Sequence, residues 1–79
     1  EDSEHYPLEI VAGSFEKVVT DPQHPNWLRA EALIAYAEIA PFAEQLSKLR
    51  QSKRATRVLT KFQDLWERYW LELCRADEH

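Results

Sequence analysis

Apolar residues between positions 27 and 49 recur at alternating steps of four and three, the spacing that keeps side chains on one face of an α-helix. This stripe consists of Leu28, Ala32, Ala35, Ile39, Phe42, Leu46 and Leu49. Other apolar residues lie away from the stripe, and a helix that is apolar on nearly all sides is normally buried on nearly all sides. The pattern predicts a central helix over residues 27–49, with Asn26 as its N-cap. Pro41 predicts a kink rather than a break, because the stripe passes through it in phase.

A second stripe begins at residue 55 and marks the most strongly amphipathic segment of the chain. Its members are Ala55, Leu59, Phe62, Trp66, Tyr69 and Leu73. In one straight helix the two stripes would face about 180° apart, and one bundle could not bury both. We therefore expect a reversal near residues 50–53, with Ser52 as the N-cap of a helix over 53–75. Because the reversal contains no Gly or Pro, a continuous helix exchanged between two protomers remains an alternative.

The N-terminal part of the chain predicts a shorter helix over residues 7–19. Apolar residues recur there at helical spacing, and Pro7 suits the first helical position. Two X-Pro pairs between residues 21 and 25 then disfavour helix and predict a loop. The whole pattern predicts an all-α three-helix bundle, in which a long antiparallel hairpin packs with the shorter N-terminal helix. Residues 1–6 are expected to form an acidic tail, 7–76 a single helical domain and 77–79 a frayed C-terminus.

Composition agrees with one helical domain and restricts its setting. The chain has 79 residues, of which 44% are hydrophobic, and contains one Gly and four Pro, which disfavours both a disordered chain and an all-β fold. Cys74 is the only cysteine, so the chain has no internal disulfide and no multi-cysteine metal cluster. A lone cysteine fits a reducing compartment, and we expect a cytoplasmic protein. No apolar run approaches the roughly 20 residues that span a bilayer. The chain lacks an initiator Met, which leaves open that it is a fragment.

Motifs for catalysis, cofactor binding and metal binding are missing from the sequence. There is no Gly-rich phosphate loop, no His-Glu-x-x-His and no Cys-His pair at plausible local spacing. Glu31 and Glu38 are seven residues apart and share a helix face, but a polar strip where the helix meets water explains them more simply than a catalytic carboxylate pair. We therefore expect a protein that is not an enzyme, without catalytic residues, metal site or cofactor.

Charge is segregated along the chain, although the formal net charge is only −4. Between residues 45 and 63 there are six basic residues and no acid, whereas the remainder holds 14 acids against four basic residues, a balance of −10. The basic set is Lys48, Arg50, Lys53, Arg54, Arg57 and Lys61. A solvated outer face is the simplest interpretation. Contact with an acidic protein surface or with the acids of a second copy is the next, and phosphate backbone the third.

Apolar residues outside the two stripes exceed what three short helices can obviously bury. We expect a partner-binding surface that includes Leu33, Ile34, Tyr36, Trp70 and Leu71. The favoured hypothesis is a small non-catalytic protein–protein interaction module, an adaptor or regulatory subunit that docks by a helix face and forms a homodimer. The alternative is a nucleic-acid-binding accessory domain that uses the basic 48–61 face. No membrane partner is expected.

Overall fold

The protein folds as an all-α three-helix bundle in a computed structural model that describes the backbone of residues 6–76 and the side chains of residues 7–73. Helix α1 spans Tyr6–Thr20, α2 spans Asn26–Arg50 and α3 spans Lys53–Ala76. The predicted architecture is confirmed, and the predicted helix bounds differ from these by at most one residue. The expected acidic tail and frayed C-terminus lie outside the described residues, except that Tyr6 already belongs to α1.

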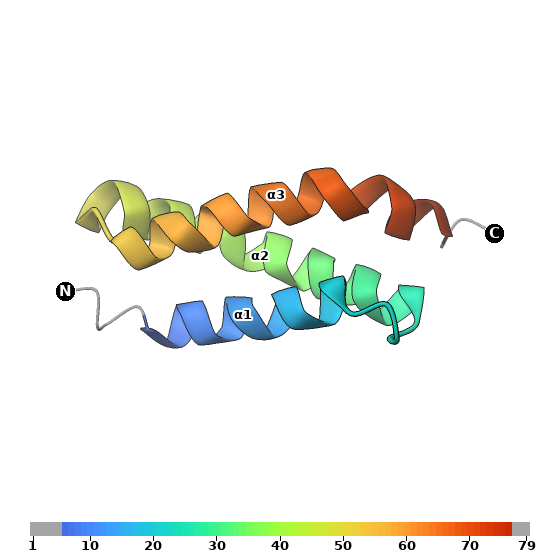
Figure 1. Ribbon diagram of the computed structural model, residues 1–79. Coiled ribbons are helices and arrows are strands. Elements are labelled where there is room, and N and C mark those ends of the chain that lie inside the picture. The colour runs from blue at the N-terminus through green and yellow to red at the C-terminus, as the bar shows by residue number, and fades with distance from the viewer. Residues whose placement is uncertain (1–5, 77–79) are drawn as a thin grey trace.

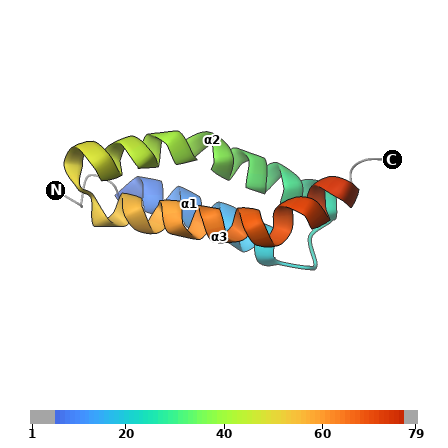
Figure 2. The same ribbon diagram turned by 90° about the horizontal axis from the view of Figure 1, so that it is seen from above.

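The long hairpin and the short helix pack side by side. Helices α1 and α3 run in the same direction, and α2 runs antiparallel to both (Figure 1). The turned view places α2 along one edge of the bundle, with α1 and α3 both on its other side (Figure 2). One long face of α2 is therefore left without a neighbouring helix.

Helix α2 begins one residue earlier than predicted. The prediction of Asn26 as its N-cap is wrong, because Asn26 is the first helical residue. Pro25 occupies the N-cap position, where φ is −65° and the backbone is extended, without a side-chain capping bond. Proline fixes φ close to this value, so Pro25 sets the backbone direction at the start of the helix. Farther along, α2 continues through Pro41 as one helix. The kink at Pro41 is not established and stays a prediction.

The reversal between α2 and α3 is made by Gln51 and Ser52. Gln51 adopts the left-handed conformation, with φ 53° and ψ 38°, and its backbone N–H points back to the Leu46 carbonyl. Such a residue commonly ends a helix, although glycine is the usual occupant. The buried Ser52 hydroxyl accepts a hydrogen bond from the backbone N–H of Ala55, at 3.2 Å. Ser52 is thus the N-cap of α3 as predicted, and the two long arms form a hairpin within one chain.

The face that α2 buries differs from the predicted one. Leu33, Tyr36, Ala40 and Ala43 are buried, whereas Phe42 and Leu49 of the predicted stripe are 55% and 80% exposed. The buried face is displaced by one residue, or about 100° around the helix. The expectation that Leu33 and Tyr36 belong to an exposed surface is therefore wrong. The Tyr36 ring contacts Phe15 of α1 and Phe62 of α3, and Leu33 belongs to the same buried core.

The core is continuous through the bundle. Its buried apolar members come from all three helices: Ala12, Val19, Ala30, Ala32, Leu33, Tyr36, Ala43, Ala55, Val58, Leu65 and Leu73. Partly buried rings, including Phe15, Phe62 and Trp66, pack around them. Most of these buried members are alanine or valine, so larger apolar side chains are left at the edges of the bundle.

Candidate functional site

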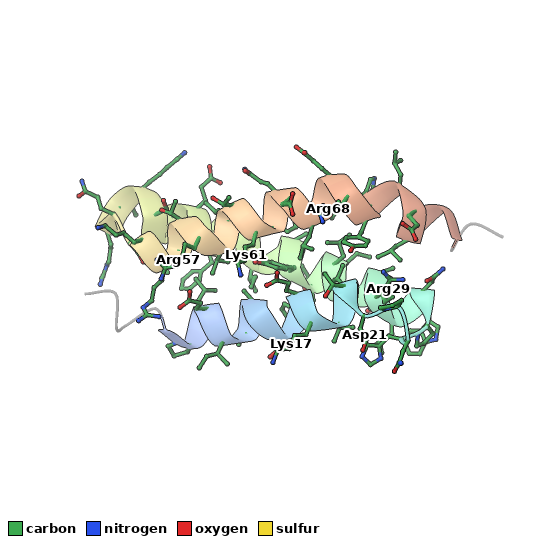
Figure 3. The ribbon with its side chains drawn as sticks, in the orientation of Figure 1. Lys17, Asp21, Arg29, Arg57, Lys61 and Arg68 are labelled. Atoms are coloured by element: carbon green, nitrogen blue, oxygen red, sulfur yellow. The ribbon has the colours of Figure 1, made fainter. Side chains whose placement is uncertain are left out.

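A charged seam joins α1 to the first half of α3. It consists of Glu9 and Glu16 on α1 and of Arg54, Arg57 and Lys61 on α3. Both Arg54 and Arg57 pair with the Glu9 carboxylate, with Arg57 Nε 3.4 Å from Glu9 Oε2. Lys61 Nζ lies 3.5 Å from Glu16 Oε1. Figure 3 shows Arg57 and Lys61 on the side of α3 that faces α1.

The seam changes the interpretation of the basic run. Three of its six cations meet carboxylates of α1, which the sequence places more than 40 residues away. Lys48 pairs within its own helix, with its Nζ 3.2 Å from Glu44 Oε2. Arg50 and Lys53 are exposed at the turn between the long helices. The run is therefore not an unpaired cationic face, because folding brings acids to half of it.

The seam also changes the acidity of Glu9. The hydrogen bond from Arg54 is the main cause that lowers the pKa of the Glu9 carboxyl from its ordinary value of 4.5. The charge and hydrogen bond of Arg57 act in the same direction, while partial burial opposes them. Glu9 therefore stays ionised to lower pH in the folded protein than in the unfolded chain. The seam stabilises the folded state at pH values above the ordinary pKa of Glu9, and this stabilisation is lost as the pH falls through the lowered pKa.

A cavity of about 140 Å³ lies beneath the charged seam. Gly13 forms part of its wall, and a Cβ added at Gly13 would meet no atom within 4 Å. Tyr36 and Val58 line it from α2 and α3, and all the seam residues except Arg54 line it from α1 and α3. Gly13 is thus not required by close backbone approach.

Tyr36 is the polar group at the centre of the bundle. It is 1% exposed, and its hydroxyl donates a hydrogen bond to the Val58 carbonyl of α3 at 2.9 Å. Its ring lies between those of Phe15 and Phe62, with centroid separations of 6.3 and 5.3 Å. Burial, assisted by the nearby Glu16 charge, raises the pKa of Tyr36 to about 12. Tyr36 of α2 therefore contacts both α1 and α3 within the core.

Arg29 is a buried cation that the sequence analysis left without a role. Its Nε donates to the Val19 carbonyl near the end of α1 at 2.8 Å, and its Nη1 lies 3.4 Å from Asn26 Oδ1. The guanidinium lies 5.5 Å from the centroid of the Tyr69 ring on α3. Figure 3 shows Arg29 at the end of the bundle where α1 finishes. A signal was present, since the last carbonyls of α1 need donors and Arg29 follows the connecting loop closely.

The five predicted partner residues do not form one surface. Leu33 and Tyr36 are in the core, and Trp70 is half-buried, with its ring stacked on Trp66 at a centroid distance of 4.1 Å. Leu71 is exposed on the opposite side of α3 from its buried residues. Only Ile34 remains on the free side of α2. These burials leave a different set of exposed apolar residues to consider.

Most of the exposed apolar residues of α2 lie on its outer face, the face opposite its buried side. Trp27, Ile34, Phe42 and Leu49 are 61%, 45%, 55% and 80% exposed. The polar residues Glu31, Glu38 and Gln45 alternate with them and are also exposed. At 100° per residue, all seven fall within an arc of about 80°. Neither glutamate has an ion-pair partner among the described residues.

Two further properties bear on function. Within the described part of the chain, no three His, Cys, Asp or Glu residues are grouped so that they could hold a metal ion. Over the same residues, none of the three helices is both long and apolar enough to cross a membrane. Comparison of the chain with protein-family models, curated proteins and solved structures found no match. A functional hypothesis therefore rests on the surface of the chain itself.

Proposed function

We propose that this protein is a small non-catalytic interaction module, an adaptor or regulatory subunit, that docks through the outer face of α2 and self-associates. The observation that carries the proposal is the exposure of Trp27, Ile34, Phe42 and Leu49 on one face of one helix. Singly exposed apolar residues are common on protein surfaces, but an apolar face with several large side chains is typical of a docking site.

The arrangement of the helices supports this assignment. Both α1 and α3 lie on the other side of α2, so no element of the described chain covers the outer face (Figure 2). Helix-face docking uses apolar anchors that recur at whole turns of one helix, and Ile34, Phe42 and Leu49 follow one another about two turns apart. The lone Cys74 supports a cytoplasmic setting for such a module, as noted above.

The nucleic-acid alternative has less support. A phosphate-binding face needs cations that are free to replace the counterions of the nucleic acid. Arg54, Arg57 and Lys61 instead pair with Glu9 and Glu16 of the same chain. Binding phosphate through these cations would break the seam, so no specific observation favours that function.

Sedimentation equilibrium tests the proposal with a matched pair of variants. The chain has a mass of 9.3 kDa, and we expect a reversible dimer at micromolar concentration. Ile34→Glu places a charge on the outer face and should shift the protein to monomer. Ile10→Glu changes the same residue type at similar exposure, 52% against 45%, but on α1, and should leave the dimer intact. Circular dichroism confirms that both variants keep their helicity.

The two variants distinguish a specific docking face from non-specific association of exposed apolar residues. Equal weakening by both variants would show that non-specific apolar contact drives association. A monomer at several hundred micromolar would remove self-association from the proposal.

A further inference from the structure

The outer face of α2 has a mirror-symmetric order about Glu38. Ile34 and Phe42 each lie four residues from Glu38, Glu31 and Gln45 each lie seven, and Trp27 and Leu49 each lie eleven. At every step the two members have the same character: apolar at four, polar at seven and apolar at eleven. A face with this order matches itself when it is turned end to end.

From this order we infer that two copies pair through antiparallel α2 helices, with a two-fold axis that passes beside Glu38. The inference rests on the proposed function and specifies the partner and the register. A two-fold interface requires that a residue i which contacts j be matched by the same contact from j to i. The mirror order satisfies that condition along the exposed length of α2, whereas a parallel pairing would set each residue against its own copy.

The apolar contacts follow from this register. Ile34 meets Phe42 of the second copy, and Trp27 meets Leu49 of the second copy, each twice because of the symmetry. Each contact joins a large exposed ring to an exposed aliphatic side chain. The four side chains offer roughly 500 Å² per protomer, so the dimer would bury roughly 1,000 Å² in total, near the lower limit of specific interfaces. This area fits a reversible dimer rather than an obligate one.

In this register, the two glutamates of the outer face have opposite effects on the stability of the dimer. Glu31 faces Gln45 of the second copy, and Lys48 of the second copy lies one turn farther along, within reach of the Glu31 carboxylate. The Lys48 side chain is 71% exposed, and among the described residues it pairs only with Glu44, whose side chain is 54% exposed. Glu38 instead meets Glu38 of the second copy at the axis, where the like charges repel. Glu31 therefore favours the dimer and Glu38 opposes it.

Cysteine crosslinking tests the register directly. In a Cys74→Ser background, Glu38→Cys should be linked to its own copy by a short bismaleimide, because position 38 lies at the axis. Glu31→Cys is the matched control on the same face. Its two copies would lie about 21 Å apart along the paired helices, since each is seven residues from the axis at 1.5 Å per residue, and it should not be linked. Mixing Ile34→Cys with Phe42→Cys should give the heterologous link, whereas neither variant alone should.

Charge variants provide an independent measurement of the same arrangement. Glu38→Gln should lower the dimer dissociation constant by roughly threefold, and Glu31→Gln should raise it by a similar factor. Equal effects of the two substitutions, or equal crosslinking at positions 31 and 38, would overturn the register while leaving the interaction module standing. A dimer that is linked at neither position would place the interface elsewhere. A monomer at all concentrations would remove both the register and the self-association.

Discussion

Replacing Tyr36 with phenylalanine tests the assignment of this residue to the core. Phenylalanine keeps the ring and its contacts with Phe15 and Phe62, so the variant loses only the hydroxyl and its 2.9 Å bond to the Val58 carbonyl. A buried hydrogen bond of this kind contributes about 1 kcal/mol to the free energy of unfolding. For a domain of 60–100 residues, that loss lowers the melting temperature by about 4–8 °C.

Tyr69→Phe is the matched control. Tyr69 is half-buried, its ring lies under the Arg29 guanidinium, and its hydroxyl has no hydrogen bond among the described residues. The control therefore removes the same atom without a buried partner, and its melting temperature should change by less than half as much. If the two variants melt together, the Tyr36 hydroxyl does not tie α2 to α3 and the buried face of α2 has been misassigned.

The same variant has a pH signature that a simple packing change lacks. Because the pKa of Tyr36 is raised to about 12 in the folded protein, against about 10 in the unfolded chain, the unfolded state loses the proton first as the pH rises. Tyr36 thus contributes its full stability below about pH 10 and loses about 1.4 kcal/mol per pH unit between about pH 10 and 12.

Urea unfolding at several pH values measures this effect. Wild type should be the more stable protein at pH 9, and Tyr36→Phe should equal or exceed it at pH 11. A stability difference that stays constant over this range would mean that the Tyr36 hydroxyl is not buried and that the cavity side of the core is open to water.

Two further changes test the seam and the turn. Glu9→Gln should destabilise the protein at pH 7 and reduce the loss of stability below about pH 4.5, because it removes the carboxylate whose pKa Arg54 and Arg57 lower. In thermal melts, Glu67→Gln should change the stability at pH 7 little, because it removes an exposed carboxylate of α3 that has no ion pair among the described residues. Gln51→Gly should raise the free energy of unfolding by about 0.5–1 kcal/mol in urea titrations, because glycine adopts φ 53° without strain. Destabilisation by Gln51→Gly would mean that the Gln51 side chain has a role in the turn.

The features predicted correctly are those fixed by local chemistry. Ser52 was recognisable as an N-cap because a hydroxyl at the start of a strongly amphipathic segment is a local signal, and the two stripes required a reversal beside it. The reversal itself was harder to predict, since Gln51 adopts the left-handed conformation that glycine usually adopts at the end of a helix. The number of helices and their bounds follow from the same short-range pattern.

The features that were missed depend on how the helices meet. Nothing near Arg54 in the sequence indicates Glu9, which lies 45 residues earlier, so the pairing appears only when α1 packs beside α3. The buried face of α2 was missed for a related reason. Its apolar residues cover so much of the helix that periodicity alone supports two faces about 100° apart, and short-range patterns cannot choose between them.

Polar groups account for the choice between these two faces. If α2 turned to bury Phe42 and Leu49, Arg29 would lose the Val19 carbonyl and Tyr36 would lose the Val58 carbonyl, at 2.8 and 2.9 Å in the observed arrangement. Each loss would leave a polar group either unsatisfied or out of the core, which costs more than apolar contacts of equal area can easily offset. We infer that these two bonds set the rotation of α2. The same rotation leaves Phe42 and Leu49 exposed, so the bonds that specify the core also create the surface that we propose binds a second copy.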